Sequence, residues 1–193
     1  MMRRALWQNW RASRELTRRA ASYVAVLGAE PNEGDVAWLA LAGTHGDRDH
    51  ACWELRYARR ALGLLSAQRD ALDDRTASVV AHALAEALAR DPAVAAGKLR
   101  MAERQLNARL TGYAEALSNR EGAGSGWHLG RRLLEFAGRR DAVAPEDVMR
   151  ASELLSRYLD EANSALREHF GLASLPEDVA PSSLAAVRSP RFP

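Results

Sequence analysis

The chain has 193 residues, of which 47% are hydrophobic and 27% are charged, and its formal net charge is +2. This length and composition suit one globular domain with a substantial apolar core, and they exclude a disordered or collagen-like chain. A net charge this small is also not typical of a protein whose whole surface binds polyanions.

The spacing of apolar residues predicts an amphipathic helix over residues 3–27. Alternating four- and three-residue steps place one set of side chains on a single seam: Leu6, Trp10, Ser13, Thr17, Ala20, Val24 and Leu27. Gly28 ends this helix, since glycine is favoured just past a helix C-terminus. We expect Asp35 to cap a short second helix, which Gly43 ends.

A long helix is predicted to begin near Asp49 and to contain no proline for some forty residues. It either continues to about residue 90 or breaks or bends around residues 69–74, where polar residues interrupt the apolar stripe, and we favour a break or bend. Asp91 followed by Pro92 has the pattern of an N-cap and a first helical residue. We therefore predict that the next helix begins at Pro92 with almost no loop.

The C-terminal half contains one glycine-rich segment, residues 121–126, which predicts a flexible loop. A short helix over residues 127–137 and a longer one over residues 145–170 follow it. We predict an all-α protein: an antiparallel helical bundle with about four long helices and two or three short ones. The bundle forms a single domain over residues 1–171, and residues 172–193 form an extended, proline-containing tail.

The segment from Gly43 to Glu54 concentrates side chains capable of chemistry, including two of the five histidines and the only cysteine. Imidazole and carboxylate groups are common metal ligands, and residues four apart share one helix face. One interpretation is a metal site formed by His45, Asp49, His50 and Glu54. The other is structural: Asp47 or Asp49 caps a helix, acidic residues complement its dipole, and Cys52 packs.

The first predicted helix is strongly basic, with six arginines and one glutamate between residues 3 and 19. Tryptophan and arginine dominate the energetics of many protein interfaces, so we expect an interaction surface in this helix. Its candidate residues are Trp7, Trp10, Arg11, Arg14 and Arg18. There are three alternatives to a protein interface: the basic face is simply solvated, it contacts an anionic membrane surface, or it contacts nucleic-acid phosphates. The chain has no recognisable DNA-reading motif, which disfavours nucleic acid.

No catalytic motif is complete, because the sequence has neither a Gly-x-Ser-x-Gly elbow nor a phosphate-binding loop. Whether the protein is an enzyme, and which cofactor it uses, therefore stay open. A single cysteine and an arginine-rich, lysine-poor composition are typical of a bacterial protein in the reducing cytoplasm. The sequence contains no run of about 18 apolar residues, so it predicts no membrane span.

These features predict a non-enzymatic helical interaction or scaffold protein. It acts through apolar helix faces and arginine-rich surface, by binding a protein partner or by self-association. The first alternative is a metal-binding protein or metal-dependent enzyme with its site at residues 43–54. The second is a protein whose basic first helix binds an anionic surface or nucleic acid.

Overall fold

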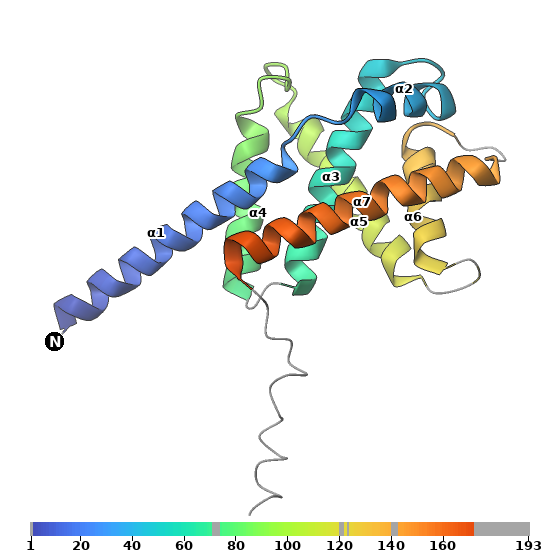
Figure 1. The fold of residues 1–193 in the computed structure, drawn as a ribbon. Coiled ribbons are helices and arrows are strands. Elements are labelled where there is room, and N and C mark those ends of the chain that lie inside the picture. The colour runs from blue at the N-terminus through green and yellow to red at the C-terminus, as the bar shows by residue number, and fades with distance from the viewer. Residues whose placement is uncertain (1, 71–73, 120–121, 123, 140–142, 172–193) are drawn as a thin grey trace, which may run out of the picture.

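The computed structural model describes residues 2–70, 74–119, 122, 124–139 and 143–171, with residues 2–10 described by their backbone alone. Seven helices and no strand occur within these ranges, which confirms the all-α prediction (Figure 1). The helices are α1 (Met2–Leu27), α2 (Glu33–Ala42), α3 (Arg48–Asp70), α4 (Asp74–Ala89), α5 (Leu99–Ser118), α6 (Gly124–Phe136) and α7 (Pro145–Phe170). None of these helices is both long and apolar enough to cross a bilayer.

Helix α3 lies at the centre of the molecule and packs against α2, α4, α5 and α7. Small residues allow its neighbours to approach closely. At Gly63, an added Cβ would lie 2.4 Å from the Leu27 side chain of α1. The buried Tyr23 hydroxyl, also on α1, donates a hydrogen bond of 2.8 Å to the Gly63 carbonyl. The absence of a side chain at Gly63 therefore lets the C-terminal half of α1 rest on α3.

Helices α6 and α7 meet at an even closer contact. A Cβ added to Gly130 on α6 would lie 2.3 Å from the Val148 carbonyl oxygen and 2.8 Å from the Ser152 amide nitrogen, both on the α7 backbone. Because backbone cannot move aside as a flexible side chain can, glycine is required where the two helices cross. Buried Leu133, Val148 and Leu155 surround this crossing with apolar packing.

Several predicted boundaries agree with the structure. The long helix is divided where we favoured a break or bend, since α3 ends at Asp70 and α4 begins at Asp74. Pro145 occupies the first turn of α7, where its missing N–H leaves no helical hydrogen bond unmade. The predicted tail, residues 172–193, lies outside the described residues.

The prediction that a helix begins at Pro92 is wrong, since α5 begins at Leu99. Asp91 does accept a hydrogen bond of 2.9 Å from the Ala93 amide, as an N-cap would. The turn ends before residue 95, and a second turn follows in which Gly97 adopts a φ of +80°, in the left-handed region. The Asp91 carboxylate also binds Arg60 on α3 at 2.6 Å. It therefore fixes the connection between α4 and α5 to the core.

Two further boundaries differ from the prediction. Asn32, rather than Asp35, caps α2 by accepting a hydrogen bond of 2.8 Å from the Gly34 amide. Asp35 instead pairs with Arg157 of α7 at 2.8 Å. Helix α6 begins at Gly124, so half of the segment predicted as a glycine-rich loop is helical. Close packing of Gly126 and Gly130 against α7 stabilises helix where local propensity alone favours a loop.

Candidate functional site

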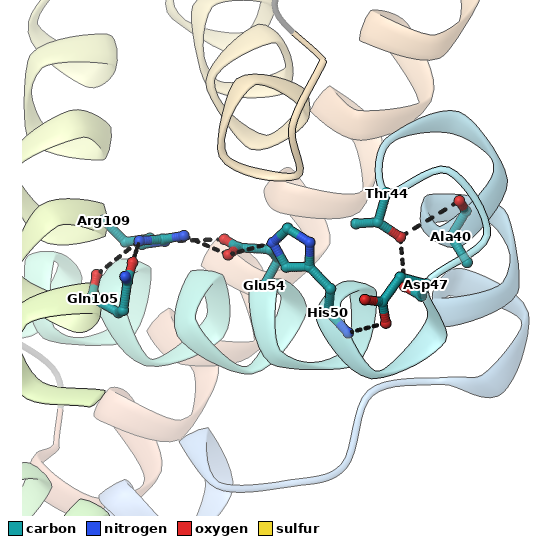
Figure 2. Close-up of polar contacts among 7 residues, drawn as sticks. All are labelled: Ala40, Thr44, Asp47, His50, Glu54, Gln105 and Arg109. Carbon is teal, nitrogen blue, oxygen red and sulfur yellow. Dashed lines mark hydrogen bonds and ion pairs between the residues drawn. The ribbon is translucent and has the colours of Figure 1, made fainter. Parts of the chain in front are cut away.

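The connection between α2 and α3 is a tight turn that ends in a helix cap. His45 and Gly46 both adopt positive φ angles, of 54° and 91°, which reverse the chain after Gly43. The Asp47 carboxylate then accepts a hydrogen bond of 2.9 Å from the His50 amide, and the Thr44 hydroxyl donates to the Asp47 carbonyl (Figure 2). The structural interpretation of this segment therefore holds for Asp47, which caps α3.

Nearly two turns into α3, the Glu54 carboxylate is buried in the helix interface. Its side chain is 2% exposed, and the partner is Arg109 of α5, whose side chain is 8% exposed. The Arg109 Nε donates to Glu54 Oε2 at 3.0 Å, and its Nη2 donates to Oε1 (Figure 2). Two parallel hydrogen bonds of this kind are the strongest geometry that a guanidinium and a carboxylate can form.

Other groups complete the surroundings of Arg109. Its Nη1 donates to the side-chain oxygen of Gln105, one turn earlier on α5. The guanidinium carbon lies 4.6 Å from the ring centroid of Phe136 and 5.5 Å from that of Tyr57. Aromatic rings attract a cation through their electron-rich faces, so Phe136 and Tyr57 add to the stabilisation of the guanidinium charge.

His50 connects this buried pair to the surface. Its Nε2 lies 3.3 Å from Glu54 Oε1, and 42% of its side chain is exposed. Glu54 is thus shared between one cation that is buried and one imidazole that solvent reaches. The pairing follows from the helix, because residues four positions apart lie on the same face of α3.

Of the four predicted metal ligands, the structure brings together His50 and Glu54. His45 and Asp49 are exposed, and Asp49 precedes His50 by one position, which turns its side chain to another face of α3. Within the described ranges, no three His, Cys, Asp or Glu side chains are grouped so that they would hold a metal ion. Glu54 is moreover occupied by Arg109. Metal binding at this junction stays a prediction that a direct measurement must test.

A cavity of about 340 Å³ lies beside the buried pair, between α3, α5 and the turn that precedes α5. Glu54, Arg109 and Gln105 contribute polar groups to its wall. Trp53 and Tyr57 form an aromatic side, with ring centroids 5.3 Å apart. A volume of a few hundred Å³ with an apolar wall and few polar groups is typical of sites for small organic molecules.

Cys52 lies on α3 between His50 and Glu54 but faces a different environment. It is partly buried and packs against the core. Burial raises the pKa of its thiol, and the nearby Arg56 only partly counteracts this effect. A raised pKa leaves less of the nucleophilic thiolate at neutral pH, so the structure favours a packed thiol over a reactive one.

The second predicted site, on the first helix, lies at the edge of the molecule. Figure 1 shows the N-terminal half of α1 extending beyond the other helices, while its C-terminal half packs against α4 and α7. Arg11, Arg14 and Arg18 are exposed. The side chains of Trp7 and Trp10 lie outside the described part of the structure.

Arginines surround the one acidic side chain of this segment. The Glu15 carboxylate binds Arg18 at 2.8 Å and Arg19 at 2.9 Å. Hydrogen bonds from these two guanidinium groups lower the pKa of Glu15 to about 2. Glu15 is therefore ionised at physiological pH, yet it offsets only one of the six positive charges between residues 3 and 19.

Sequence reasoning missed Arg109, which is central to the buried site. One signal was present: Arg109 follows Leu106 by three positions and precedes Tyr113 by four, so it lies on the buried stripe of α5. An arginine on an apolar stripe needs a buried partner. The sequence does not say which of the many acidic residues supplies that partner.

Comparisons with known proteins supply no family for this chain. A scan against protein-family models, a search of curated proteins and a search of solved structures found no match. The function is therefore inferred from the side chains and surfaces described above.

Proposed function

We propose that the protein is a helical interaction protein whose projecting first helix binds an acidic helical surface of a protein partner. The observation that carries this proposal is the N-terminal half of α1, a basic segment that extends beyond the other described helices (Figure 1). A helix so placed can enter a partner's groove without any rearrangement of the domain.

The apolar seam of α1 supports a helical partner. Its C-terminal positions Ala20, Val24 and Leu27 are buried against the domain. The same spacing continues toward the N-terminus through Leu6 and Trp10, in the half of the helix that projects. The apolar stripe of the C-terminal half of α1 packs against the domain. The same stripe in the projecting half is suited to pack against a helix of another protein.

Charge selects the kind of partner. The six arginines and one glutamate between residues 3 and 19 would bring strong like-charge repulsion to two copies of α1 packed side by side. An acidic helix meets the same surface with opposite charge. We therefore favour an acidic protein partner over the self-association that the sequence left equally open.

The remaining sequence-based expectations fit this proposal. An antiparallel bundle with about four long helices, α1 among them, would anchor the C-terminal half of α1 and leave its N-terminal half to project. A bacterial, cytoplasmic protein with one cysteine would meet its partner in a reducing compartment. A non-enzymatic role needs none of the catalytic motifs that the sequence lacks.

A pair of designed peptides tests the proposal. Both are helical, about three heptads long, with leucine at the a and d positions; one carries glutamate at the flanking e and g positions and the other carries lysine. We expect the full chain to bind the acidic peptide, measured by fluorescence anisotropy, with an affinity that falls steeply as salt rises. The basic peptide should not bind.

Two double variants locate the surface. Arg11→Glu with Arg14→Glu should abolish binding of the acidic peptide, whereas Arg100→Glu with Arg104→Glu, on exposed positions of α5, changes the net charge equally and should have little effect. Equal loss in both variants would show a diffuse charge effect and contradict the proposal. Light scattering that shows a dimer dissociated by the α1 variant would instead identify a second copy as the occupant. Binding to phosphatidylserine vesicles or to DNA without binding to the peptide would favour the anionic-surface alternative.

A further inference from the structure

The cavity beside Glu54 and Arg109 has an unequal distribution of charge and apolar surface. Glu54 and Arg109 neutralise each other within hydrogen-bond distance, so neither contributes a net charge to the space. Lys98, the only lysine of the chain, also lines the cavity and forms no ion pair within the described ranges. The cavity therefore presents one uncompensated positive charge at its edge.

The remaining wall is suited to a hydrocarbon group. Trp53 and Tyr57 place two rings along one side, and Val94 and Met101 lie on the lining as well. Arg56 lies over the Trp53 ring at 5.1 Å, which fixes one of the two ring positions. Met101 is 45% exposed, although it is large and apolar. An exposed methionine at the edge of an aromatic cavity offers an adaptable contact for a small apolar ligand.

From this arrangement we infer that the cavity binds a small aromatic monocarboxylate. The ring lies against Trp53 and Tyr57, and the carboxylate pairs with the Lys98 ammonium. A single free cation matches one negative charge, whereas a phosphate dianion usually requires several donors. A volume of about 340 Å³ accommodates one ring system with a short acidic side chain. This site is independent of the α1 surface, because no residue of α1 lines the cavity.

The buried pair of Glu54 and Arg109 orders one wall of the cavity. Arg109 donates to Glu54 and Gln105, so these three polar groups hold one another in place along the cavity wall. Groups fixed in this way do not need to be ordered when a ligand binds, which reduces the entropic cost of binding. His50, at 3.3 Å from Glu54, adds a polar group to the cavity lining.

Three ligands with the same body and different charge test the inference: 3-phenylpropionate, its neutral amide 3-phenylpropionamide and the cation 3-phenylpropylamine. Binding to the full chain is measured by isothermal titration calorimetry. We expect the acid to bind about tenfold more tightly than the amide, and the amine to bind more weakly than the amide. Absence of saturable binding of the acid at millimolar concentration would overturn the inference.

Substitutions at exposed positions distinguish binding in this cavity from a general effect of the protein's charge. Lys98→Gln should reduce binding of the acid to the level of the amide and leave binding of the amide unchanged. Arg100→Gln removes one positive charge two residues away, outside the cavity lining, and should preserve the preference for the acid. Met101→Glu places a negative charge at the edge of the cavity, which repels the ligand carboxylate. It should weaken binding of the acid more than binding of the amide. An equal effect of Lys98→Gln and Arg100→Gln would contradict the inference.

Discussion

Arg109 on α5 holds the buried carboxylate of Glu54 on α3 through hydrogen bonds to both oxygens, across 55 positions of sequence. The pair ties together two helices that enclose the proposed ligand cavity. Removal of two charges from water is costly, and only good geometry and further hydrogen bonds offset that cost. Here the bidentate contact, Gln105 and two aromatic rings supply them.

Substitution of one member of this pair should destabilise the protein strongly. Glu54→Leu leaves the Arg109 charge buried without its partner, and we expect a loss of about 3–5 kcal/mol in the free energy of unfolding. The double variant Glu54→Leu with Arg109→Met should recover most of the loss, because it leaves no unpaired charge. Urea denaturation followed by circular dichroism measures both changes.

Arg90→Ala is the control for this experiment. Arg90 is 75% exposed and pairs with Glu86 on the surface of α4. We expect a change of at most about 0.5 kcal/mol, as is usual for exposed ion pairs. If Glu54→Leu costs no more than Arg90→Ala, the buried pair does not contribute as described.

Gly130→Ala should destabilise the contact between α6 and α7. The new methyl group would lie 2.3 Å from the Val148 carbonyl oxygen, so one helix must move away from the other. We expect a net loss of about 1–3 kcal/mol, despite the better helix propensity of alanine. Thermal unfolding followed by calorimetry measures the change.

Gly126→Ala provides the matched comparison on the same helix. Its added methyl group would meet only the Ser152 hydroxyl, at 3.0 Å, and that hydroxyl can rotate away. We expect this variant to be as stable as the original chain or slightly more stable. Equal destabilisation by the two substitutions would show that α6 and α7 are not in such close contact at Gly130.

Acid should weaken the link between Asp91 and Arg60. Burial raises the pKa of Asp91, but hydrogen bonds from Arg60 and the Ala93 amide outweigh it and leave the pKa below the ordinary 3.8. Because the pKa is lowered on folding, the link contributes its full stabilisation at pH values above the ordinary pKa of 3.8. This contribution is lost as the pH falls from the ordinary pKa through the lowered one. We expect the original chain to lose more stability between about pH 5 and pH 2 than Asp91→Asn does. Urea denaturation at a series of pH values tests this, and parallel curves for the two chains would contradict it.

Cys52 should react slowly in the folded protein. Burial raises the pKa of the thiol, so less thiolate is present near neutral pH than in the unfolded chain. We expect iodoacetamide to modify the native protein more slowly than the same protein in urea, as measured by mass spectrometry over time. Faster modification of the native protein would reveal an activated cysteine.

Metal content tests the site predicted from His45, Asp49, His50 and Glu54. Arg109 binds Glu54, and no group of three metal-binding side chains forms around His50 within the described ranges, so an ion there would compete with Arg109 for the Glu54 carboxylate. We therefore expect substoichiometric metal in protein purified without a histidine tag, measured by elemental analysis. A stoichiometric ion that His50→Ala removes would support the metal-site hypothesis.

The helical class and many of the boundaries could be read from the amino-acid order. A helix depends on hydrogen bonds four residues apart and on caps within one turn, so the signals that start α7 at Pro145 and break the chain before Asp74 are local. The same reasoning succeeds for the turn before α3, where Asp47 caps the helix.

Contacts between distant segments determine the features that local sequence patterns left open or predicted wrongly, namely two helix starts and the partner of Glu54. Asp91 and Pro92 have the local pattern of a helix start, but the Asp91 carboxylate is held by Arg60 of α3, and the chain turns at Gly97. Gly126 has the local preference of a loop and lies in a helix because α7 packs against it. The sequence placed Glu54 beside His50, and only the fold brought Arg109 to its carboxylate. Energies of pairing and close packing act between surfaces that the chain brings together only on folding, and for that reason no local pattern records them.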